Sequence, residues 1–181
     1  QWWIDPFAFF REALGVGDWP RPDTTTLGGR RIFYTHIDGD GLRNRSEVRP
    51  GASSGQVIYD EILTRYRLPT SASVVVAEVE PSLLGSPEFF ELARAIYALP
   101  NVEAGSHSYT HPLDWQKRTR SFSPAHVPYS VETETAGSVR YMEERLLPAG
   151  KRVRLFQWSG STRVTEDAIA ILDRLGVPNI N

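Results

Sequence analysis

The sequence alternates between short runs of β-branched or aromatic residues and amphipathic stretches with helical spacing, and this alternation restricts the fold more than any other feature. Candidate strands cover residues 30–38, 71–79, 102–111 and 153–160, and a last one begins at 177. Candidate helices lie between them at 53–68, 86–100, 131–150 and 165–177. Strands that alternate with helices predict an α/β domain with a parallel sheet or barrel, here of about five strands.

The ends of three candidate helices carry capping residues. Ser54 is the expected N-cap of the first helix, and Ser86, followed by Pro87, is the expected start of the second. Thr165 is the expected N-cap of the last helix, and Gly176 is its expected stop.

Residues 1–29 differ from this pattern and are expected to form an N-terminal helix and a linker ahead of a domain at 30–181. The aromatic stretch 1–15 predicts a helix that stops at Gly15 and either packs locally or contacts a preceding domain. Residues 19–29 are rich in Pro, Gly and Thr, which is typical of a linker. The chain starts at Gln1 and its single methionine is Met142, so we expect it to be a piece of a longer protein.

Composition and charge exclude several classes of function. The net charge is −2 and no basic block occurs, which argues against a nucleic-acid partner. The chain has no cysteine, so disulfides and thiolate metal sites are excluded. No apolar run reaches the roughly 18 residues that a membrane span needs, and no signal peptide is visible.

Polar side chains gather where three of the candidate strands end. Asp38 and Asp40 follow the first strand in YTHIDGDGL, and His107 and His111 follow the third. The segment 157–159, Gln-Trp-Ser, ends the fourth. Because the carboxyl ends of parallel strands share one edge of a sheet, we expect these groups to meet in one cleft.

Two imidazoles and a carboxylate predict a site for a divalent metal with room for water or substrate. The histidines are four residues apart, so they would share one face of a helical turn. The two aspartates can divide their roles, with one binding the metal and the other acting on water. Gly39 and Gly41 are expected to let the backbone turn sharply between them.

Other interpretations of these residues stay open. An Asp-Gly pair often makes only a turn, and a calcium loop would need flanking helices and a distal glutamate that are missing here. His36 suits a supporting or packing role better than a ligand role. His126 lies in a polar loop, where we expect it to be exposed.

The motifs IDGDG and HSYTH resemble those of the NodB-type polysaccharide deacetylases, a family of metal-dependent carbohydrate esterases. The resemblance implies a (β/α) barrel of the NodB homology type, truncated here after about five of some seven strands. It also implies that Asp38 is the catalytic base and that Asp40, His107 and His111 bind a divalent metal, with Zn²⁺ the expected ion.

Three longer stretches, HIDGDGLRNRSE, EAGSHSYTHPLDW and LFQWSG, are most similar to one subgroup, the deacetylase domain of proteins that make the Pel exopolysaccharide. This similarity implies hydrolysis of N-acetyl groups on a polymer containing N-acetylgalactosamine and N-acetylglucosamine, during biofilm matrix synthesis and export. It further implies a periplasmic location and, as partners, the polysaccharide and proteins of the export machinery.

The chain departs from the family pattern in two ways. Gln157 stands where the family has an arginine that orients the base, so Arg43, Arg45 or Arg163 could substitute for it. The family's late motifs, including the histidine that protonates the leaving amine, would lie beyond Asn181.

Four further residues complete the predicted site. A backbone amide at Ser159 or Gly160 is expected to bind the oxyanion, while Trp158 and Trp115 either stack on a sugar ring or pack in the core. Two alternative functions stay open: a hydrolase of the same fold that cleaves another ester or amide, and an inactive, metal-containing carbohydrate-binding module.

Overall fold

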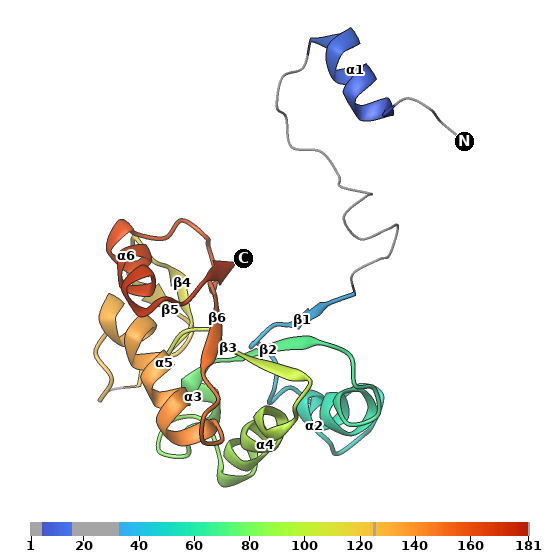
Figure 1. Cartoon of the computed structure of the whole chain (residues 1–181). Helices are drawn as coiled ribbons and strands as arrows, with labels where there is room; N and C mark the ends of the chain where they lie inside the picture. Colours follow the sequence, from blue (N-terminus) through green and yellow to red (C-terminus); the bar gives the residue numbers. More distant parts are fainter. Residues whose placement is uncertain (1–4, 16–32, 125, 181) are drawn as a thin grey trace. The chain divides into compact units, whose positions relative to one another are not determined.

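The computed structural model describes residues 5–15, 33–124 and 126–180, which fall into two compact units, 1–32 and 33–181 (Figure 1). The first unit contains helix α1 (Pro6–Leu14), which is followed by Gly15 with a φ of 61°. The predicted helix and its stop are therefore confirmed, whereas the predicted linker at 19–29 lies outside the described residues.

The second unit is built on a sheet of five parallel strands, which confirms the predicted α/β class. Their order in the sheet is β1 (Thr35–Ile37), β2 (Thr70–Val74), β3 (Val102–Ser106), β6 (Val153–Gln157) and β7 (Asn179–Ile180). A small antiparallel hairpin of β4 (Pro112–Asp114) and β5 (Thr119–Arg120) lies apart from it. No strand was predicted from the sequence at the positions of this hairpin.

Helices follow the strands in the predicted order. They are α2 (Ser54–Ile58) with its π-helical continuation η1 (Tyr59–Leu63), α3 (Val76–Val79), α4 (Pro87–Ala98), the continuous run η2 (Thr133–Gly137), α5 (Ser138–Tyr141) and η3 (Met142–Leu146), and α6 (Glu166–Leu175). Helices α2, α4 and α5 are arranged around one side of the sheet (Figure 1). Within the described residues, no helix is long and apolar enough to cross a membrane.

The predicted helix caps are mostly confirmed. The Ser86 hydroxyl accepts a hydrogen bond from the Phe89 amide at 3.3 Å, and Gly176 has the left-handed φ of 65°. Thr165 occupies the cap position of α6 without accepting a capping hydrogen bond. The prediction for α2 is wrong by one residue, because it is Ser53 whose hydroxyl accepts from the third amide along, that of Gln56.

The predicted strand at 71–79 is wrong in its second half. β2 ends at Val74, and the next residues form the helical turn α3. The amide of Val76 donates to the Ser108 carbonyl at 3.2 Å, and the amide of Ala77 donates to the Tyr109 carbonyl at 2.8 Å. Long-range hydrogen bonds to the loop after β3 therefore override the β preference of this valine-rich segment.

The hydrophobic core lies between the sheet and the helices. Tyr97 of α4 is fully buried, and its hydroxyl donates to the Ala72 carbonyl of β2 at 3.2 Å. Burial raises the pKa of Tyr97 far above its ordinary value, so this phenol stays protonated. Burial of Tyr97 and this hydrogen bond together hold α4 against β2.

Candidate metal centre

The carboxyl ends of β1 and β3 bring the predicted ligands together, and the end of β6 lies beside them. Asp40 comes from the loop after β1, and His107 and His111 come from the loop after β3. One possible ligand atom from each of these three residues lies within 4.8 Å of the other two. The structure therefore assembles the aspartate and the two histidines that the sequence placed on one rim.

The closest approaches are between imidazole nitrogens and carboxylate oxygens. His111 Nε2 lies 2.9 Å from Asp40 Oδ1, and His107 Nε2 lies 3.3 Å from the same oxygen. His107 Nε2 is also 3.2 Å from Asp38 Oδ1. Asp38 thus stands beside the three-residue cluster, within reach of the same point.

The other ring nitrogen of His107 shows which tautomer is present. His107 Nδ1 lies 3.1 Å from the Gln157 carbonyl oxygen, which can only accept, so Nδ1 carries the proton. Burial lowers the pKa of His107, more than the nearby Asp38 and Asp40 carboxylates raise it. The neutral ring therefore directs the lone pair of Nε2 at two carboxylates.

A lone pair that faces carboxylate oxygens is repulsive unless a cation lies between them. His111 is oriented in a comparable way, because its Nδ1 is hydrogen bonded at 2.7 Å to Ser121 Oγ, a hydroxyl that can donate or accept. Its buried Nε2 makes no hydrogen bond, although Asp40 Oδ1 is only 2.9 Å away. Oriented imidazoles and a shared carboxylate are the donor set and the outer support typical of a zinc site, so the residues fit a divalent metal.

The histidine loop, which we define as residues 107–111, is not the helical turn that the four-residue spacing suggested. Ser108 and His111 have left-handed φ values of 72° and 58°. The amide of His111 donates to the Ser108 hydroxyl at 3.1 Å, which closes the loop locally. Strained backbone at residues other than glycine persists where surrounding structure enforces it, and such strain gathers at functional sites.

A buried carboxylate supplies that enforcement. Glu134 is fully buried in η2 and accepts hydrogen bonds from the amides of Tyr109 at 3.0 Å and Thr110 at 2.7 Å, and from the Thr110 hydroxyl. Burial raises the pKa of Glu134, and these hydrogen bonds oppose the rise. Glu134 was not predicted from the sequence as part of the site. The feature that could have identified it is its place on the buried side of a predicted helix, three residues after Val131 and four before Ser138.

The acidic loop, which we define as residues 38–41, is organised differently. The amide of Asp40 donates to Asp38 Oδ1 at 3.1 Å, as in an Asx-turn. Gly41 has a φ of 96°, so the sharp turn lies there. A sharp turn was predicted at Gly39 as well, but glycine is required there for a different reason. A Cβ at this position would lie 2.6 Å from Cβ of His107, so no larger side chain has room.

The second oxygen of Asp38 is held by Gln157. Gln157 Nε2 donates to Asp38 Oδ2 at 3.1 Å, from the position where the resembled family has its arginine. Gln157 therefore makes the contact with Asp38 for which the sequence left Arg43, Arg45 or Arg163 as possible substitutes. His36 Nε2 donates to Gln157 Oε1 at 2.5 Å, which confirms its expected supporting role, and His126 is exposed as expected.

The four remaining predicted residues lie close to this rim, with two of them in the core. Trp115 and Trp158 are 1% and 5% exposed and pack edge to face with ring centroids 5.0 Å apart, so the core-packing alternative holds and neither presents a face to a sugar. Ser159 is buried, and its hydroxyl donates to the Pro112 carbonyl at 2.9 Å. Gly160 is exposed with a φ of 61°, and an oxyanion role for these two amides stays a prediction.

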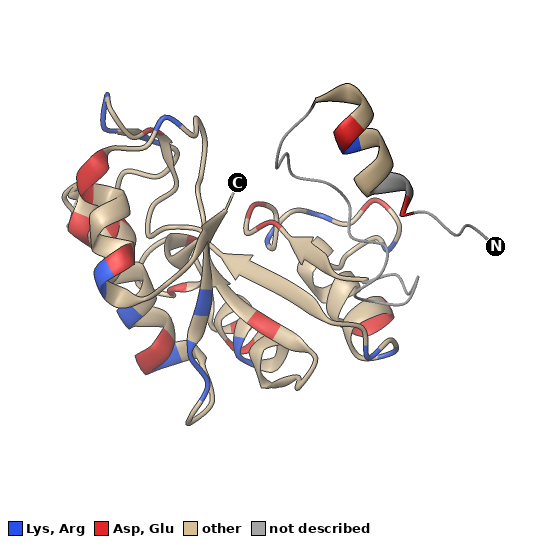
Figure 2. Cartoon of the chain, turned by 45° about the horizontal axis from the view of Figure 1, so that its top comes forward, with Lys and Arg blue, Asp and Glu red and all other residues tan. Residues whose placement is uncertain are grey.

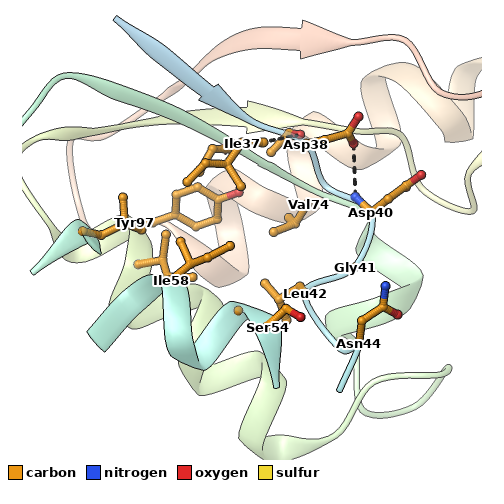
Figure 3. Close-up of a pocket in the computed structure, with 15 residues that line it drawn as sticks. Ile37, Asp38, Asp40, Gly41, Leu42, Asn44, Ser54, Ile58, Val74 and Tyr97 are labelled. Carbon is orange, nitrogen blue, oxygen red and sulfur yellow. Dashed lines mark hydrogen bonds between the residues drawn. The ribbon is translucent and has the colours of Figure 1, made fainter. Parts of the chain in front are cut away.

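A cavity of about 180 Å³ lies directly beneath the acidic loop (Figure 3). Asp38 and Asp40 line one part of it, while Ile37, Ile58 and Tyr97 contribute apolar side chains from β1, α2 and α4. The lining of the cavity is mainly apolar, whereas the Asp38 and Asp40 side chains beside it are more than half exposed.

Comparisons with known proteins support the fold. No protein-family model matches the sequence, and no curated protein matches it. Similar solved structures include two at 20% sequence identity. One is a mutant of BA3943, described as a CE4 family pseudoenzyme with restored enzymatic activity, and the other is wild-type BA3943, a CE4 family pseudoenzyme from Bacillus anthracis. The TM-scores are 0.52 and 0.51, over 82% and 81% of this chain.

The chain spans 43% and 41% of the length of those two proteins. At this level of identity the likeness establishes the fold alone. The five parallel strands with their helices correspond to a half-barrel of the CE4 fold, with Asp40, His107 and His111 grouped at its rim.

Proposed function

We propose that this chain carries the metal centre of a deacetylase that removes N-acetyl groups from a polymeric amino sugar. The observation that carries the proposal is the cluster of Asp40, His107 and His111, with Asp38 beside it, at the strand ends of a CE4-type half-barrel. A cluster of two histidines and one carboxylate at this edge of an α/β fold is suited to metal-assisted hydrolysis.

Each residue of the cluster has a role that its contacts support. Asp40, His107 and His111 would hold a divalent ion, which we propose to be zinc and which when bound would polarise the acetyl carbonyl. Asp38 is more than half exposed, so it can reach the attacking water and accept its proton. We assign the oxyanion contact to a backbone amide at Ser159 or Gly160.

We further propose the substrate and setting that the sequence motifs imply. The substrate would be an exopolysaccharide of the Pel type with N-acetylgalactosamine and N-acetylglucosamine units, deacetylated in the periplasm before export. The support is the similarity of HIDGDGLRNRSE and EAGSHSYTHPLDW to that subgroup of deacetylases. Proteins of the export machinery would then be partners.

A metal-containing binding module without activity is the second candidate. The observation that favours it is that the similar structures belong to a protein described as a pseudoenzyme, whose mutant has restored activity. The neutral Gln157 beside Asp38, where the resembled family has an arginine, is a second departure of the kind expected in an inactive member.

Metal content and acetate release, measured together on the complete gene product, separate the two candidates. We expect zinc to co-purify and acetate to be released from an N-acetylated amino-sugar polymer, but not from an O-acetylated one. His107→Ala should lose the zinc, and Asp38→Ala should retain it but release no acetate. His126→Ala and Asp173→Ala, at exposed positions, are the matched controls.

Each alternative predicts a different result. Zinc binding and saccharide binding without acetate release from the wild-type protein would establish the binding module and refute the deacetylase. Release from the O-acetylated polymer alone would indicate a hydrolase of another ester.

A further inference from the structure

The side chain of Gln157 makes three hydrogen bonds at the carboxyl end of β6. Its Oε1 accepts from Ser73 Oγ at 2.8 Å and from His36 Nε2 at 2.5 Å, and its Nε2 donates to Asp38 Oδ2 at 3.1 Å. Gln157 is 8% exposed and Ser73 is 4% exposed. The amide is therefore enclosed on one side by two donors and on the other by a carboxylate.

These contacts make the orientation of the amide specific. An amide group offers an acceptor at one end and donors at the other, so the two ends are not interchangeable. If the group were rotated by half a turn, its oxygen would face the carboxylate of Asp38, and two acceptors would be in contact. The two donors that converge on Oε1 stabilise the orientation that presents N–H to Asp38.

The backbone and the side chain of Gln157 form hydrogen bonds with different residues. Its carbonyl oxygen accepts from His107 Nδ1 at 3.1 Å, whereas its side chain contacts Asp38. A substitution of the side chain therefore leaves the backbone support of His107 in place. This separation allows the orientation of Asp38 to be tested apart from metal binding.

We propose that Gln157 is a positioning residue for Asp38, with His36 and Ser73 fixing the orientation of its amide. A neutral amide donor replaces the arginine of the resembled family. A directional hydrogen bond to Oδ2, and not an ion pair with an arginine, therefore orients Asp38. The inference rests on the proposed function, because positioning matters for catalysis only if Asp38 is the base.

The kinetic test compares Gln157→Met with Gln116→Met in the complete gene product. Methionine keeps the approximate volume but cannot donate, so we expect kcat for acetate release to fall about 100-fold with KM and zinc content unchanged, since a small misplacement of a reacting group can cost that much. Gln116 is exposed in the hairpin, and its variant should keep wild-type kinetics. Wild-type kcat in Gln157→Met would overturn the inference while leaving the deacetylase intact.

Rescue tests the role of His36. His36→Gln supplies an amide N–H that can donate to Gln157 Oε1, whereas His36→Leu cannot. We expect kcat to fall at least 10-fold in His36→Leu and to recover at least in part in His36→Gln. Equal activity in the two variants would show that His36 only fills space.

A crystallographic comparison keeps the inference testable without activity. In crystal structures of the complete wild-type and Gln157→Met proteins, we expect the Asp38 carboxylate to leave its wild-type position when the amide is removed. An unmoved carboxylate would overturn the positioning role. Absence of acetate release from the wild-type protein would instead refute the proposed function, and the structures would still decide the role of Gln157.

Discussion

The two loops that form the candidate metal centre are held in opposite ways. The His107 and His111 side chains are 3% and 10% exposed, and a hydrogen bond at Nδ1 holds each ring, with the Gln157 carbonyl and the Ser121 hydroxyl respectively. The Asp38 and Asp40 side chains are 54% and 56% exposed, and their loop is held by a local turn and by Gln157. In Figure 2 the Asp and Glu residues of the chain are red, and they are spread over helices and loops together with Lys and Arg.

This difference indicates which half of the centre is preorganised. The histidine loop is strained, buried and anchored by Glu134, so we expect its nitrogens to keep their positions when a ligand binds. The acidic loop is more open and can adjust to water and substrate. If this comparison is right, substitutions of the residues that anchor the histidine loop will lower the free energy of unfolding. Substitutions in the acidic loop will lower it only where the new side chain collides with a histidine.

The largest effect is expected from Glu134→Ala. The change leaves the buried amides of Tyr109 and Thr110 without an acceptor, and hydrogen bonds to charged groups are strong. We expect the free energy of unfolding to fall by about 3 kcal/mol, measured by urea denaturation, together with weaker zinc binding. Glu132→Ala, at an exposed position of the same helical run, is the control. Equal stability of the two variants would mean that the histidine loop does not depend on its buried anchor.

Gly39→Ala tests the contact between the two loops. The new Cβ would lie 2.6 Å from His107 Cβ, so one of the loops must shift. We expect destabilisation of about 1–3 kcal/mol, as for other overpacked sites, and reduced zinc affinity by calorimetry. In Gly137→Ala the added Cβ has its closest contact at 3.5 Å, and this helical control should not be destabilised. Unaltered zinc affinity in Gly39→Ala would show that the acidic loop yields without moving His107.

A smaller effect is expected from Ser121→Ala. The hydroxyl of Ser121 orients His111 through Nδ1, and loss of such outer partners lowers metal affinity about 10-fold or more. Stability without metal should change little, because Ser121 is exposed. The control is Ser123→Ala, also exposed. Matching zinc affinities for the two variants would contradict an orienting role for Ser121.

The smallest effect concerns Glu78 of α3, whose electrostatics involve the acidic loop. Burial raises the pKa of Glu78 from its ordinary 4.5 to about 7; Arg43 opposes the rise and Asp40 adds to it. Because the folded-state pKa is raised, the stabilising contribution is present below pH 4.5 and is lost as the pH rises through 7.

The measurement is the urea midpoint between pH 4.5 and 8 with a chelator present, so that metal binding does not contribute. Relative to Glu78→Gln, the wild-type protein should lose stability as the pH rises. Glu144→Gln, exposed in η3, should follow the wild-type curve. Parallel curves for wild type and Glu78→Gln would show that Glu78 is effectively solvated.

Much of the fold followed from local sequence signals. The order of strands and helices, the caps at Ser86 and Gly176, and the stop at Gly15 rest on periodicity and capping chemistry, which act over a few residues. The failures were at 71–79 and 107–111, where segments far apart in the chain bond to each other and override local preference.

The candidate site shows the same division between features that follow from local sequence and features that depend on distant segments. The sequence by itself determined which residues can bind a metal, because the chemistry of Asp40, His107 and His111 and their places at strand ends follow from residue type and order. Only the tertiary structure decided that Gln157 holds Asp38, that Glu134 anchors the histidine loop, and that Trp115 and Trp158 are buried. These outcomes depend on the direction of a hydrogen bond and on what covers a side chain, and both are set by elements distant in the sequence.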